Sequence, residues 1–129
     1  MKRFAWMAVM VLALAGSGFG WDVRYRPLYP SLNDEITIEI RGAEQGATLH
    51  WGVNAVGAMW EQALPEYRPA GSSEEGFATR TKMEGPDEKG VLRLKLGPFD
   101  NTNQLVRALN FAINWDNGEW SNKDERNYN

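Results

Sequence analysis

Aromatic rings and hydrogen-bonding side chains lie close together in the carboxy-terminal segment 111–129. Trp115 and Trp120 are there among Asp116, Asn117 and Asn122. A pyranose ring presents C–H groups on its face and hydroxyls around its rim. It therefore fits an aromatic platform that is bordered by groups able to donate and accept hydrogen bonds. These residue types in this spacing are typical of a sugar-binding surface.

Two further candidates lie earlier in the chain, His50 and Trp60. His50 is the only histidine, and the alternation of the segment 48–54 places it on the face opposite Trp51, which we expect in the core. Trp60 lies in the segment 55–73, whose glycines and prolines predict a long loop. Loops of this length in a compact domain are usually functional or disordered, and the large aromatics argue against disorder.

The two carboxy-terminal tryptophans differ in their surroundings. Trp115 continues an apolar series with Leu109, Phe111 and Ile113, which favours a core position. Trp120 lies beyond that series among polar residues, which favours an exposed position. Either could be the stacking platform, and the core pattern at Trp115 makes Trp120 the preferred candidate.

The fold class follows from an apolar period of two along most of the chain. Strands are expected at 23–29, 35–41, 48–54, 77–83, 91–96 and 105–115. Turn signals separate them at intervals of roughly ten residues, and no amphipathic helix lies between them. The sequence predicts an all-β protein, an antiparallel β-sandwich of immunoglobulin-like architecture with six to eight short strands.

The amino-terminal residues have the composition of a secretory signal. Lys2 and Arg3 precede a short apolar run, and small residues follow it. We expect residues 1–20 to be a signal peptide cleaved after Gly20 or, alternatively, after Ala15, and residues 21–129 to form one domain. The run is too short for a membrane-spanning helix. We therefore expect a secreted or periplasmic protein with no membrane anchor after cleavage.

Charge and residue types argue against several classes of function. Removing residues 1–20 changes the formal net charge from −3 to −5, and basic and acidic residues are interspersed, so no nucleic-acid partner is expected. Acidic pairs such as Glu61 and Glu66 are available to a glycosidase, but a chain with 17 acidic residues always offers such pairs. There is no cysteine and no G-x-S-x-G motif. We expect no enzyme activity and no catalytic residues.

Metal and cofactor binding have little support in the sequence. Zinc would need more histidine or cysteine than the chain contains. Calcium is the only credible metal, because the segment 116–119 offers oxygen ligands, and it stays open as an alternative although the spacing does not match an EF-hand loop. We expect no cofactor and no metal site.

Three short motifs, in this order, resemble starch-binding carbohydrate-binding modules of families twenty-five and twenty-six. They are LHWGVN at 49–54, MWEQALPEYRP at 59–69, and W-x-N at 120–122 followed by NY at 127–128. The HWGV, tryptophan and proline portion is also similar to the starch-binding modules of plant glucan water dikinases. The resemblance covers essentially the whole of residues 21–129. One departure is Ser121, which stands where the family pattern has an aspartate.

The resemblance implies a non-catalytic β-sandwich that binds α-1,4-glucan, as starch, glycogen or maltooligosaccharides. The matched binding residues are His50, Trp60 and Trp120. Asn122, Asn117 and Asp116 are the expected hydrogen-bonding neighbours. A secreted or periplasmic glycan-active enzyme is a further expected partner. The alternative from another class is a small secreted interaction subunit, whose exposed aromatics dock on an enzyme or a cell-surface protein.

Overall fold

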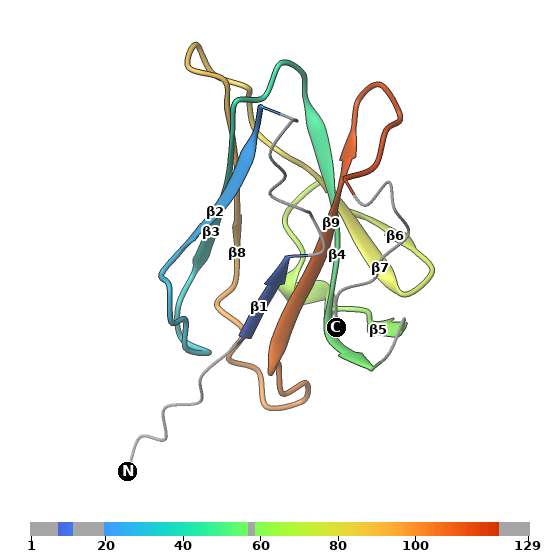
Figure 1. Ribbon diagram of the computed structural model, residues 1–129. Coiled ribbons are helices and arrows are strands. Elements are labelled where there is room, and N and C mark those ends of the chain that lie inside the picture. Colours follow the sequence, from blue (N-terminus) through green and yellow to red (C-terminus); the bar gives the residue numbers. More distant parts are fainter. Residues whose placement is uncertain (1–7, 12–19, 57–58, 122–129) are drawn as a thin grey trace.

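Two β-sheets pack face to face around one hydrophobic core (Figure 1). The computed structural model describes residues 8–11, 20–56 and 59–121. The first sheet has the order β1-β9-β4-β7-β6, with β5 also paired to β4, and the second has the order β2-β3-β8. The strands are β1 (Ala8–Val11), β2 (Asp22–Arg26), β3 (Ile36–Arg41), β4 (Ala47–Val56), β5 (Met59–Glu61), β6 (Ser73–Glu75), β7 (Ala78–Lys82), β8 (Val91–Leu96) and β9 (Ala108–Trp115). The predicted immunoglobulin-like sandwich is confirmed.

The second sheet shows the expected alternation and one difference from it. Ile36, Ile38 and Ile40 of β3 are fully buried, because residues two apart along a strand share a face. Glu39, on the opposite face, is also buried, and Arg26 and two further arginines form ion pairs with its carboxylate.

Strand β4 is the centre of the first sheet and carries the predicted faces. It pairs antiparallel with β9 on one edge and with β7 and β5 on the other. Leu49, Trp51 and Val53 are fully buried, and the Trp51 indole donates a hydrogen bond to Thr81 Oγ1 at 3.0 Å. The core position predicted for Trp51 is confirmed. His50 is thereby directed to the outer face of this sheet.

The segment predicted as a loop, 55–73, contains regular structure. Strand β5 pairs with β4, and a 3₁₀ helix follows at Pro65–Tyr67. Trp60 therefore lies on a short edge strand, which positions it more rigidly than a loop would. The last strand also begins at Ala108 rather than at residue 105 as expected, and Leu105, which precedes it, is 48% exposed.

The amino-terminal strand β1 pairs with β9 in parallel, whereas the other strand pairs are antiparallel. Ala8 to Val11 lie opposite Ala108 to Phe111. These four residues belong to the segment expected to be a signal peptide. Within the described ranges, no helix is long and apolar enough to cross a membrane.

Candidate functional site

Two tryptophans from distant parts of the chain flank His50 on the outer face of the first sheet. The Trp60 ring centroid lies 5.7 Å from that of His50, with the planes tilted by 52°. The Trp120 ring lies 5.2 Å away on an edge-to-face angle of 90°. The structure thus brings together three sequence-predicted residues that are separated by up to 70 positions. We call these three residues the aromatic triad.

Gly52 explains how Trp60 reaches the triad. It follows His50 by two positions on β4, so both face outward. A Cβ atom at Gly52 would lie 3.0 Å from the Trp60 Cβ, and 3.0 Å and 3.2 Å from the carbonyl oxygens of Glu61 and Phe77. The missing side chain lets β5 and the start of β7 approach β4, and Trp60 lies above the space this leaves.

Arg80 connects the members of the site. It is opposite His50 in the β4–β7 ladder, and its Nη2 donates a 2.6 Å hydrogen bond to Asn114 Oδ1. Its Nε forms an ion pair with Glu75 at 3.3 Å, and its guanidinium carbon lies 5.6 Å from the Trp120 ring centroid. A guanidinium above an indole face is a favourable cation–π arrangement. Arg80 therefore fixes the relative positions of the histidine and the second tryptophan.

The contact between Arg80 and His50 also sets the tautomer of the imidazole. Arg80 Nη1 lies 3.5 Å from His50 Nδ1, and a guanidinium can only donate. Nδ1 is therefore the acceptor, and the proton of the neutral ring is on Nε2. Burial lowers the pKa of His50 below 6.5, the Arg80 charge lowers it further and Glu75 raises it. A neutral imidazole with an N–H suits donation to a sugar hydroxyl.

Trp120 is held by a chain reversal after β9. It forms an antiparallel bridge with Asn114, and the Ser121 hydroxyl accepts a 2.9 Å hydrogen bond from the Ile113 backbone N–H. The Trp120 side chain remains 36% exposed. Ser121, which stands where the family pattern has an aspartate, thus helps to anchor the platform.

Two of the remaining sequence-predicted residues, Asp116 and Asn117, lie outside the triad. Asp116 forms an ion pair with Lys82 at 2.6 Å. Lys82 is opposite Thr48 in the β4–β7 ladder, two positions before His50 on β4. The Asn117 backbone N–H donates to Gln45, and its side-chain oxygen accepts from the Glu119 N–H. Asn122 lies outside the described residues. The roles of these three residues in binding stay predictions.

Two of the side-chain oxygens of segment 116–119 have partners within the fold: Asp116 Oδ1 accepts from Lys82, and Asn117 Oδ1 accepts from the Glu119 N–H. Within the described part of the chain, no group of three or more histidine, aspartate or glutamate residues could hold a metal ion.

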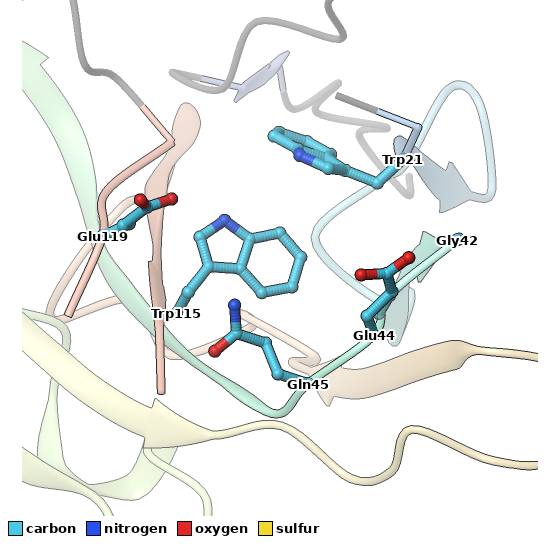
Figure 2. A pocket seen from close by; sticks show the side chains of 7 residues that line it. Trp21, Gly42, Glu44, Gln45, Trp115 and Glu119 are labelled. Atoms are coloured by element: carbon cyan, nitrogen blue, oxygen red, sulfur yellow. The ribbon is translucent and has the colours of Figure 1, made fainter. Parts of the chain in front are cut away.

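A hollow with aromatic walls lies apart from the aromatic triad, where the two sheets meet (Figure 2). It has a volume of about 180 Å³ and is lined by Trp21, Trp115 and several polar residues. The two indoles meet edge to face with centroids 5.5 Å apart. Trp115 is only 7% exposed and packs in the core cluster. Trp115 is therefore mainly a core residue, as its apolar series predicts, and Trp120 stays the preferred candidate for the stacking platform.

Arg80 and Asn114 belong to the site although their sequence context does not single them out. The polar side of a strand can point towards any neighbour, so only the pairing of β7 with β4 and the register of Arg80 opposite His50 place the guanidinium here. The sequence alone indicates only that Arg80 shares the face of His50 if the strands that carry them are neighbours. Asn114 joins by the same reasoning through β9.

An immunoglobulin-like sandwich with a histidine between two tryptophans on one sheet face is an arrangement suited to a carbohydrate-binding-like module. Residues 21–129 match the family model described as the alpha-glucan water dikinase 1 Ig-like N-terminal domain. The chain belongs to this family. No curated protein and no solved structure gives a significant match.

Proposed function

We propose that this chain is an exported module that binds α-1,4-glucan through the aromatic triad. The observation that carries the proposal is the position of His50 between Trp60 and Trp120 on an outer sheet face. One sugar ring stacks on each indole, and His50 Nε2 donates to a hydroxyl between them. The family, whose parent enzyme is named for α-glucan, supports this choice of ligand.

The binding is expected to be weak. Two stacking contacts and a few exposed hydrogen bonds correspond to a dissociation constant on the order of micromolar to millimolar, or about 4 to 8 kcal/mol. Sugar binding of this strength is useful where a module recruits a polymer with many copies of the same unit, because repeated weak contacts raise the overall affinity.

Affinity electrophoresis in native gels with and without soluble starch tests the proposal. Starch should retard the wild type, and Trp120→Ala should remove most of this retardation. Tyr29→Ala, which removes an exposed aromatic outside the triad, is the matched control and should migrate like the wild type. A wild type that no α- or β-glucan retards would refute the binding function. A Trp120→Ala variant with unchanged retardation would refute the assigned site alone.

Export is a separate part of the proposal and has its own test. The Lys2-Arg3 start, the apolar run and the small residues before Trp21 support it. Expression of the full chain in a bacterial host, followed by mass measurement of the protein from the periplasmic fraction, should give a chain that begins at Trp21 or Gly16. Recovery of the intact chain from the cytoplasmic fraction only would contradict export.

A further inference from the structure

A cleft that includes neither His50 nor Trp120 has Trp60 in its wall. It has a volume of about 650 Å³ and is lined by seven residues. These are Asn54, Met59, Trp60, Glu61, Gln62, Phe77 and Gln104. Trp60 is therefore shared by the aromatic triad and the cleft, because it contacts the His50 ring and also forms a wall of the cleft.

The accessible chemistry of the cleft is mainly apolar. Met59 and Phe77 are each 56% exposed and line the same cleft, and exposed large apolar side chains gathered at one place often mark a binding site. A flat ring, a thioether and an indole can contact the C–H face of a sugar. The Glu61 carboxylate at the edge can accept hydrogen bonds from hydroxyls.

The amides of the cleft are already used within the fold. Gln62 Nε2 donates to the carbonyls of Gly76 and Ala78, and Gln104 Nε2 donates to the carbonyl of Gln62. Asn54 Nδ2 donates to the carbonyl of Leu105. These bonds make the walls rigid and leave packing, rather than amide recognition, as the means of binding.

The cleft continues the triad along the same strand. His50 and Gly52 share the outer face of β4, and Asn54, four positions after His50 on the same strand, lines the cleft. Trp60 joins the two places, because its ring contacts that of His50 and also lines the cleft. A linear ligand that stacks on Trp60 at the triad can thus continue into the cleft without leaving the sheet face.

We propose that the cleft is a second subsite, which binds the following sugar units of the same α-glucan chain with Phe77 and Met59 as its contacts. This inference rests on the proposed function, because the occupant is the continuation of the glucan at the triad. The subsite makes affinity depend on chain length: a short oligosaccharide fills the triad only, whereas a long one fills both places.

Calorimetric titration of wild type, Phe77→Ala and Leu28→Ala with maltotriose and maltoheptaose tests this dependence. Leu28 is an exposed apolar residue on the other sheet's side of the domain and serves as the matched control. A longer sugar can also bind a single site in more than one position along its chain, which raises its apparent affinity. This statistical effect is the same for all three proteins. Phe77→Ala should bind maltotriose within about twofold of wild type and maltoheptaose about tenfold more weakly. Leu28→Ala should bind both sugars like the wild type.

Each other outcome has a distinct meaning. Equal maltoheptaose affinity in Phe77→Ala and wild type overturns the second subsite while the triad stands. Parallel loss of both sugars in Phe77→Ala, with an unchanged circular dichroism spectrum, also overturns it, because Phe77 would then act through the triad. A wild type that binds neither sugar overturns the proposed function and this inference together.

Discussion

Arg80 and His50 lie directly opposite each other in the β4–β7 ladder, with Arg80 Nη1 3.5 Å from His50 Nδ1. The strand register brings a permanent positive charge next to the only histidine of the chain. The two side chains are compatible only while the imidazole is neutral, because a protonated ring has no acceptor. The protonation state of His50 is thereby linked to the arrangement of the whole triad.

The pKa of His50 should lie below 6.5 in the wild type and rise in an Arg80→Gln variant. Burial is the first cause of the lowered pKa, and the Arg80 charge is the second. Removal of the charge should therefore move the pKa towards 6.5 without fully restoring it. Because there is one histidine, a proton NMR titration follows a single imidazole resonance without assignment work. A wild-type pKa at or above 6.5 would contradict this electrostatic description.

Folding stability should depend on the charge of His50. With the folded pKa lowered, the unfolded chain binds the proton first as the pH falls through 6.5. The contribution of neutral His50 is therefore present above the unfolded pKa and is lost as the pH falls towards and below the folded pKa. Urea unfolding at about pH 8 and about pH 5 should show a smaller loss of stability in His50→Gln than in the wild type. Equal losses in the two proteins would argue against this linkage.

Gly52→Ala should both destabilise the fold and weaken glucan binding. The new Cβ would lie 3.0 Å from the Trp60 Cβ and from a backbone oxygen, and such overpacking costs about 1–3 kcal/mol. We expect β5 to shift in relief, which changes the position of Trp60 relative to His50. Thermal unfolding and starch-gel retardation measure the two effects.

Gly46→Ala is the matched control for that substitution. Its Cβ would also be crowded, but by the ends of the Asp116 and Lys82 side chains, which can move aside. We expect little loss of stability and normal retardation. If Gly46→Ala lost retardation while Gly52→Ala kept it, the binding surface would lie around Asp116 rather than Trp60.

Asn54→Ala should lower the free energy of unfolding by about 1–3 kcal/mol. The Asn54 side-chain oxygen accepts from the N–H groups of Arg107 and Ala108, and its amide donates to the Leu105 carbonyl. Its φ is also 53°, which strains alanine but not glycine. Asn54→Gly should therefore be the more stable of the two variants in a urea titration. The reverse order would mean that backbone strain at this position is unimportant.

Much of the fold could be predicted from the sequence because buried strands keep a strict alternation. Ile36, Ile38 and Ile40 show it most clearly, and Trp51 could be assigned to the core from its neighbours alone. The burial of Glu39 could not be foreseen. It depends on Arg26 and Arg93, which the pairing of β3 with β2 and β8 brings to the carboxylate, together with Arg41 of β3 itself.

The site could be predicted in part. The alternation of apolar residues along the strands assigns Trp51 and Trp115 to the core. His50 and Trp120 fall outside that apolar pattern, in agreement with the burial in the structure. Trp60 was expected on a loop, because a three-residue edge strand is too short to establish a period. Arg80 could not be assigned, since its place beside His50 follows from a strand register that no local pattern encodes.

Titration of the protein with maltoheptaose, followed by tryptophan fluorescence, tests glucan binding at the triad most directly. Trp60 and Trp120 are at least partly exposed and contact His50. The account predicts a saturable change in emission for the wild type and no saturable change for the Trp60→Ala, Trp120→Ala double variant, with its circular dichroism spectrum retained. A wild-type emission that stays constant up to millimolar sugar, or an unaltered titration in the double variant, would contradict it.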